Sequence, residues 1–234
     1  MSYGKSDRPG LCLCALLFDQ TMQNIPGLEI YEPSDVLILG VGNILWADEG
    51  FGVRAVEAFN AKYRVSGKAK IADGGTLGMY LLDMISDTKD LLLFDCADLH
   101  AEPGTLRLLE KEEVKFWSST KISPHQTGLN ELLALAQLQG KEPERIAVVA
   151  VQPKLLEDYG GSLTEPCNAV LPEAVETARR VLVGWGYEVT ERPEGEVVAP
   201  LGPQPLNKHD YEAQRPTEAS ALREGDARFF PEFK

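Results

Sequence analysis

The sequence predicts a three-layer α/β fold, in which helices flank a central, twisted and mostly parallel sheet. Near-continuous apolar runs indicate three buried strands, at residues 36–39, 91–94 and 146–151. Stretches with apolar residues at helical spacing separate these runs. Buried strands that alternate with helices are typical of a wound, mostly parallel sheet, and no internal repeat interrupts the pattern.

The first of these units runs from Val36 to Phe59. Its apolar strand is followed by Gly40 and Gly42, which allow a tight turn, and then by the acidic pair Asp48-Glu49. A helix with one apolar face follows, on which we place Val53, Val56, Phe59 and Tyr63. In an open α/β sheet, ligands bind at the carboxyl ends of the strands, where this glycine loop lies.

A dinucleotide site is the first alternative for this loop, and the residues argue against it. The fingerprint G-x-G-x-x-G fails at its third glycine, where the chain has Leu45. Asp48 and Glu49 would also repel a pyrophosphate at the helix N-terminus. Carboxylates at a strand end are better suited to binding a metal or to transferring a proton.

The remaining elements are expected in order along the chain. A strand at 68–72 leads into the turn Asp73-Gly74-Gly75-Thr76, and a helical pattern covers 77–85. The second apolar run ends at Asp95, and a strand at 105–109 follows the Pro103-Gly104 turn. The later elements are a loop at 123–128, a helix at 129–138, the third buried strand, a helix from about 170 to 185 and an edge strand at 187–189.

Three regions are expected: an N-terminal extension at 1–33, the α/β domain at 34–190 and a loosely held tail at 191–234. The tail is rich in Pro, Gly, Glu and Arg. In the extension, the apolar run 11–18 is too short to span a membrane, and no typical signal-peptide cleavage site follows it. We expect residues 1–21 to be dispensable, with Met22 as a possible natural start. The alternative is that this run pairs as an edge strand or covers an apolar patch.

The composition excludes several classes of partner. The formal net charge of −13 disfavours non-specific binding to nucleic acid and docking on an anionic membrane. The four cysteines, Cys12, Cys14, Cys96 and Cys167, form no C-x-x-C pair and no zinc framework. We therefore expect a reducing, cytoplasmic setting.

Three polar residues carry the chemistry that we expect. Glu49, Asp95 and His125 each lie in a loop or at a strand end, at the start of the next element. Since the carboxyl ends of parallel strands share one edge, these side chains could meet in one cleft. Two carboxylates and an imidazole suit a borderline transition metal or acid–base catalysis. Singly, they could be a helix cap, a turn residue and a surface-loop histidine.

Other polar residues rank lower. Asp73 and Asp98 fit turns or hydrogen-bonding positions, His100 a surface turn and His209 the tail. The sequence contains no G-x-S-x-G elbow, and Cys96 has no evident base partner. A serine or cysteine nucleophile is therefore not indicated.

The chain resembles the hydrogenase maturation proteases, the endopeptidases that trim the large subunit of nickel–iron hydrogenases. The resemblance spans about Val36 to Val189. The matching motifs are Gly40-Val41-Gly42-Asn43-Ile44-Leu45 with Asp48-Glu49-Gly50 and Gly52; Asp73-Gly74-Gly75-Thr76 with Gly78; Asp95; and Ser123-Pro124-His125-Gln126 with Gly128-Leu129.

This resemblance implies a protease of the aspartyl class that removes the C-terminal peptide of a nickel-loaded large-subunit precursor. It implies that Glu49, Asp95 and His125 are the metal ligands and catalytic groups, and that the substrate supplies the nickel, with no intrinsic cofactor. The implied partner is the precursor, with no nucleic acid and no membrane. The alternative is a non-catalytic chaperone that binds the metal or the precursor without cutting it.

Overall fold

The centre of the fold is a five-stranded sheet with the strand order β3-β1-β4-β6-β5. The computed structural model describes residues 33–110, 113–114, 124–203 and 206–213, with only the backbone described at 124–130. Four neighbouring strands are parallel and β5 pairs antiparallel with β6 at one edge, so the predicted mostly parallel sheet is confirmed. The strands are β1 (Ser34–Val41), β3 (Ala69–Gly75), β4 (Thr88–Cys96), β5 (Leu106–Glu110) and β6 (Arg145–Val151).

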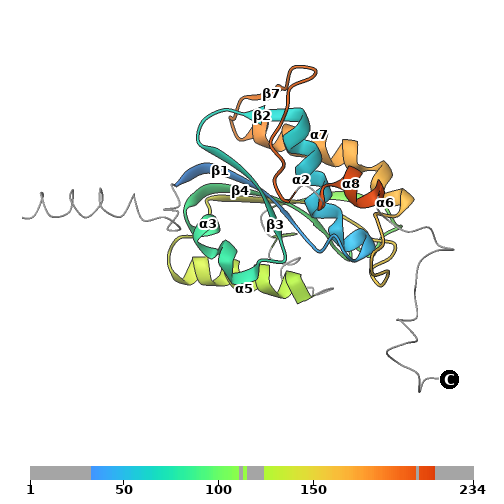
Figure 1. The fold of residues 1–234 in the computed structure, drawn as a ribbon. Coiled ribbons are helices and arrows are strands. Elements are labelled where there is room, and N and C mark those ends of the chain that lie inside the picture. Colours follow the sequence, from blue (N-terminus) through green and yellow to red (C-terminus); the bar gives the residue numbers. More distant parts are fainter. Residues whose placement is uncertain (1–32, 111–112, 115–123, 204–205, 214–234) are drawn as a thin grey trace, which may run out of the picture. The chain divides into compact units, whose positions relative to one another are not determined.

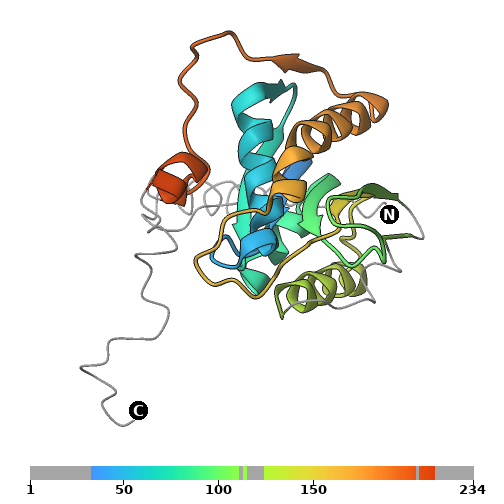
Figure 2. The same cartoon turned by 90° about the vertical axis from the view of Figure 1, so that its right-hand side faces the viewer.

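Helices cover both faces of this sheet, which gives the three layers (Figures 1 and 2). On one face lie α2 (Phe51–Lys62) and α7 (Leu171–Gly184), over a buried cluster that includes Ile38, Leu92 and Val149. On the other lie α3 (Leu82–Ser86) and α5 (Pro124–Leu138), over a cluster that includes Leu37 and Leu93. The apolar runs are continuous because alternate side chains enter opposite cores.

The predicted apolar face of the first helix is confirmed, since Val53, Val56, Phe59 and Tyr63 are all buried. Tyr63 itself lies just past the helix, in the short strand β2 (Tyr63–Val65). This strand pairs antiparallel with β7 (Val189–Glu191) in a separate two-stranded sheet. The expected edge strand near residue 189 therefore forms, but it does not extend the main sheet.

Several boundaries differ from the predicted ones. The helical pattern at 77–85 is split into a 3-10 turn, η2 (Gly78–Leu81), and α3, with Leu77 exposed. The helix expected from about residue 170 is preceded by α6 (Glu165–Ala169), with Pro172 near the start of α7. Proline is favourable in the first turn of a helix, where its missing N–H costs no hydrogen bond.

The expected loop at 123–128 is wrong from Pro124 onward, because α5 begins at that residue. Proline fits the first position of a helix, and a glycine such as Gly128 is tolerated in a helix at a cost of about 1 kcal/mol. The backbone of His125 is therefore in the first turn of a helix. The end of α5 leads into the parallel strand β6, so the start of α5 lies toward the carboxyl edge of the sheet.

The segment after β7 contacts α2. The Arg54 guanidinium, 5% exposed, donates to the carbonyl of Leu206 at 2.8 Å and lies over the ring of Tyr211. Arg192 donates to the carbonyl of Asn60 at 2.7 Å. Tyr211 belongs to a short helix, α8 (Lys208–Ala213). These contacts hold parts of the segments 192–203 and 206–213 against α2. The predicted domain boundaries stay predictions.

The expectations for residues 1–21 and for the run 11–18 fall outside the described residues. Within the part of the chain that the structure describes, no helix has the length and apolar character needed to cross a membrane.

Candidate active site

Glu49 lies at the carboxyl edge of the sheet, in a 3-10 turn η1 (Ala47–Gly50) between β1 and α2. The turn is folded back on the end of β1, where the N–H of Asn43 donates to the Glu49 carbonyl at 3.1 Å. Gly42, with φ of 132°, is required here, because a Cβ atom would lie 2.0 Å from that carbonyl oxygen. The glycine loop thus serves close backbone packing, and Glu49 is buried, at 9% exposed.

Asp95 occupies the next-to-last position of β4 and is fully buried. It alternates with Leu93 and Ala97, so its position belongs to the sheet face that α5 covers. The start of α2 is pressed against the same strand ends, since a Cβ atom at Gly52 would lie 2.2 Å from the carbonyl oxygens of Val41 and Phe94. This contact places η1 beside the end of β4.

Both predicted carboxylates influence the buried thiol of Cys96. Burial raises the pKa of Cys96 well above its ordinary value, and the negative charges of Asp95 and Glu49 raise the pKa further. Both predicted carboxylates therefore act on one buried atom. The same raised pKa keeps the thiol protonated at neutral pH, which agrees with the expectation that Cys96 is not a nucleophile.

The sequence analysis missed the role of Asp48, the residue before Glu49. Its carboxylate is fully buried and accepts four hydrogen bonds. The N–H groups of Lys154 and Leu155 and the hydroxyl of Thr164 donate to Oδ2, at 2.9, 3.0 and 2.9 Å. The N–H of Thr164 donates to Oδ1 at 2.7 Å. Asp48 thus joins the turn that carries Glu49 to the segment after β6. Its charge also contributes, after burial, to raising the pKa of Cys167 to about 11.

His125 is placed only by its backbone, in the first turn of α5 on the face of the sheet to which Asp95 belongs. Its side chain lies outside the described part of the structure. Among the described residues, no group of three or more His, Cys, Asp or Glu side chains is arranged to hold a metal ion. The predicted set of Glu49, Asp95 and His125 therefore stays a prediction.

The lower-ranked residues have the turn roles expected of them. Asp73 accepts the N–H of Gly75 at 2.9 Å, and Asp98 accepts the N–H of His100 at 3.0 Å. Burial raises the pKa of Asp73, and the Gly75 hydrogen bond acts in the opposite direction. His100 is exposed in a turn with φ of 51°, and His209 is exposed in α8.

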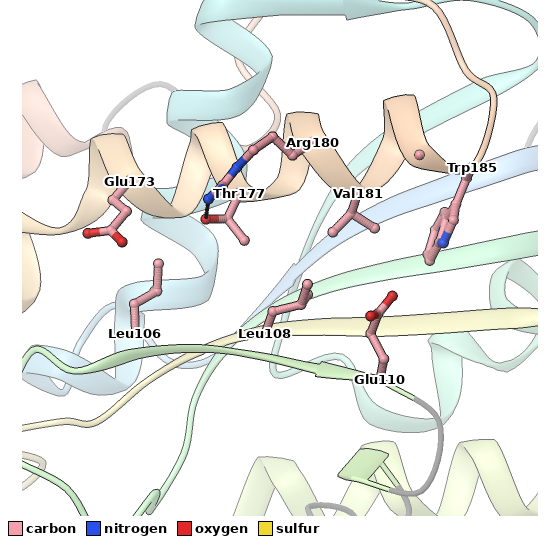
Figure 3. A pocket seen from close by; sticks show the side chains of 9 residues that line it. Leu106, Leu108, Glu110, Glu173, Thr177, Arg180, Val181 and Trp185 are labelled. Carbon is pink, nitrogen blue, oxygen red and sulfur yellow. Dashed lines mark hydrogen bonds between the residues drawn. The ribbon is translucent and has the colours of Figure 1, made fainter.

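A separate groove of about 540 Å³ runs between β5 and α7. Figure 3 shows Leu106, Leu108 and Glu110 on β5 facing α7 and Trp185 at its end. Neither Glu49 nor Asp95 lines this groove. It lies along the edge strand and is not the predicted cleft.

Comparisons with known proteins agree with one another. A family model described as hydrogenase maturation protease matches residues 53–181. The hydrogenase expression/formation protein HupD of Rhizobium leguminosarum is 50% identical over 188 residues, covering 80% of this chain and 92% of that protein. The hydrogenase 2 maturation protease of Escherichia coli is 39% identical over 158 residues, with 67% and 96% covered. The solved structure of the maturating endopeptidase HybD from E. coli superposes with a TM-score of 0.64 at 38% identity, covering 67% of this chain and 97% of that one.

Proposed function

The chain belongs to the hydrogenase maturation protease family, and on this premise we propose that it removes the C-terminal peptide of a nickel-loaded large-subunit precursor of a nickel–iron hydrogenase. It is a hydrolase that cuts a peptide bond. The observation that supports the proposal most directly is the burial of Glu49 and Asp95 at one edge of the sheet, where both charges act on the Cys96 thiol. A docking surface without chemistry needs no such pair of buried carboxylates.

In the proposed reaction, the nickel arrives with the precursor and is part of the substrate. Glu49, Asp95 and the imidazole of His125 bind it, and oxygen and nitrogen donors of this kind suit a borderline divalent metal. Binding orients the C-terminal segment of the precursor across the carboxyl edge. The metal would polarise the scissile carbonyl, and one carboxylate would take a proton from the attacking water as the C–O bond forms. The same carboxyl group would then give that proton to the nitrogen of the departing C-terminal peptide as the C–N bond breaks.

The fixed surroundings of the two carboxylates support this assignment. Glu49 lies in a turn fixed by Gly42 and by the hydrogen bonds of Asp48, and Asp95 belongs to a strand paired on both sides. Side chains on such rigid elements are preorganised, so little reorganisation is needed when the charge of the transition state develops.

The test is to incubate the purified protein with nickel-loaded and with nickel-free precursor at equal protease concentration. Mass spectrometry of the large subunit measures loss of the C-terminal peptide. We expect cleavage of the nickel-loaded precursor only. Efficient trimming of the nickel-free precursor would show that nickel is not the recognition signal, and a stable complex without any cleavage would favour the chaperone alternative.

A single variant tests the third proposed ligand. We expect His125→Ala to fold normally and to leave the nickel-loaded precursor uncut, with the circular dichroism spectrum as the control for folding. Processing at the normal rate would remove His125 from the proposed site.

A further inference from the structure

Exposed apolar side chains gather at the same edge of the sheet as the proposed site. Within the described residues, nine large apolar side chains are exposed, and five of them lie in the two segments that follow the carboxyl ends of β3 and β6. These five are Leu77, Met79, Tyr80, Leu155 and Tyr159, and we call them the apolar rim. Tyr80 is 82% exposed and Tyr159 is 68% exposed. Exposed apolar side chains are informative when several of them lie in one region of the surface.

The part of the apolar rim after β6 is fixed in place. Asp48 holds this segment at Lys154, Leu155 and Thr164 through its carboxylate, and its own N–H donates to the Leu155 carbonyl at 3.1 Å. Farther along, the N–H of Gly160 donates to the Leu45 carbonyl at 2.7 Å. The rings of Trp46 and Tyr159 meet edge to face, with centroids 5.2 Å apart. Tyr159 is thus an exposed aromatic side chain on a rigid backbone.

The other part of the apolar rim lies just past β3, in and before η2. The N–H of Leu77 donates to the carbonyl of Gly74 at 3.0 Å, and the N–H of Tyr80 donates to the carbonyl of Leu77 at 3.3 Å. η2 also contacts α5, the helix whose first turn includes His125. β3 and β6 are the neighbours of β1 and β4 in the sheet, so the two parts of the rim flank the strands that lead to Glu49 and Asp95.

We propose that the apolar rim is the docking surface for the folded body of the hydrogenase precursor, on both sides of its metal-bearing segment. This inference rests on the proposed function, because it identifies what holds the precursor at that site. A protein substrate that brings its metal to buried carboxylates must lie across the strand ends, and therefore across both parts of the rim. Rigid exposed tyrosines supply large contact area at low entropic cost, and such residues dominate binding energy at protein interfaces.

The experiment compares serine variants inside and outside the apolar rim. Tyr80→Ser and Tyr159→Ser are made beside the controls Leu138→Ser and Val197→Ser, whose wild-type side chains are 84% and 95% exposed outside the rim. With nickel-loaded precursor, we expect each rim variant to raise KM about tenfold with kcat nearly unchanged. The control variants keep both constants. Tyr159→Phe keeps the ring and is expected to restore a near-normal KM.

Wild-type KM in the rim variants, or an equal rise of KM in the controls, would overturn the proposal. A dimer that Tyr80→Ser or Tyr159→Ser dissociates without changing KM would also overturn it, since the rim would then bind a second copy of the chain. Should the wild-type protein bind the precursor without cutting it, the proposed function fails. The Kd of the same variants for the precursor then tests the rim by itself, with the same tenfold expectation.

Discussion

The two ends of β4 each bury an aspartate completely, and the two residues have opposite surroundings. At the amino end, Asp90 is held by Arg145, whose Nε and Nη2 donate at 2.8 and 2.5 Å, and by the hydroxyl of Tyr187 at 2.5 Å. At the carboxyl end, Asp95 accepts a hydrogen bond from the N–H of Cys96 at 2.8 Å. After burial, the charges of Asp95, Glu49 and Asp48 raise the pKa of the Cys96 thiol. At the amino end the aspartate is paired with a guanidinium, and at the carboxyl end several carboxylates lie around one buried thiol.

This difference distinguishes a carboxylate held in an ion pair, Asp90, from the one that we propose to be functional, Asp95. At the amino end, the hydrogen bonds to Asp90 raise the pKa of Arg145, so the guanidinium stays charged. Burial, followed by the hydrogen bond to Asp90, raises the pKa of Tyr187, so its hydroxyl stays a donor. At the carboxyl end, we propose that the grouped carboxylates receive the metal of a substrate.

The largest expected effect comes from the carboxyl end. Asp95→Asn keeps the shape of the side chain but removes its charge, and we expect processing of nickel-loaded precursor to fall about 100-fold or more. The midpoint of thermal unfolding should change little. Glu49→Gln is the matched variant. The cleavage rate is measured under single-turnover conditions. A normal rate in Asp95→Asn or in Glu49→Gln would mean that the substituted carboxylate is structural, as Asp90 is.

The amino end should give the opposite result. Arg145→Ala leaves Asp90 buried without its guanidinium partner, and we expect the free energy of unfolding to fall by about 2–3 kcal/mol, toward the low end because Arg145 is partly exposed. For a domain of this size, the unfolding midpoint should fall by roughly 5–10 °C. Cleavage by the folded fraction at low temperature is expected to be normal, and a selective loss of kcat would contradict the comparison.

We expect the effect of substituting Asp48 to combine features of the two preceding variants. Asp48 lies at the carboxyl edge of the sheet, as Asp95 does, but it is held by hydrogen-bond donors, as Asp90 is. Asp48→Asn places an amide group where N–H and O–H groups now donate to a carboxylate. We expect the free energy of unfolding to fall by about 2 kcal/mol. The segment 154–164 should open first, and limited proteolysis within it measures that opening. An unchanged cleavage pattern would mean that the four hydrogen bonds of Asp48 do not fix the segment.

The smallest effect is expected at an exposed carboxylate. The hydrogen bond from Arg179, together with the hydroxyl of Tyr63, lowers the pKa of Glu176 from its ordinary value of 4.5 to about 2. A lowered pKa in the folded state stabilises the protein above pH 4.5, and this contribution is lost as the pH falls toward 2. Glu176→Gln should therefore lower the unfolding midpoint slightly at pH 7, because solvent screens this exposed pair, and leave the midpoint near pH 2 unchanged, which flattens the acid limb. A large change at pH 7 would place Glu176 among the structural carboxylates.

The sequence predicted the strands and the order of the layers well because the relevant signals are local. The run at 91–94 is apolar at every position, and a strand buried on both faces needs that pattern. The start of α5 was missed because proline and glycine suggest a loop, whereas proline also suits the first helical turn. Glu49 and Asp95 were predicted as site residues from their places after strands, and that role stays a prediction.

The partners of the buried acids could not be predicted in the same way. Asp48 meets its donors 106 to 116 residues later in the chain, and Asp90 meets Tyr187 after 97 residues. No local pattern links such pairs. The sequence therefore identified which residues could do chemistry, and only the fold showed which buried carboxylate is a structural anchor.

The contact between Arg54 and the segment after β7 has a consequence for the order in which the protein is made. Arg54 lies one turn into α2, close behind the turn that carries Glu49, and its guanidinium donates to the carbonyl of Leu206. During synthesis, Arg54 is made 152 residues before Leu206, which carries that carbonyl. The contact between Arg54 and this carbonyl can therefore form only after residue 206 has been made. The support that Leu206 gives to α2, behind the turn that carries Glu49, is therefore added after the strands of the central sheet have been made.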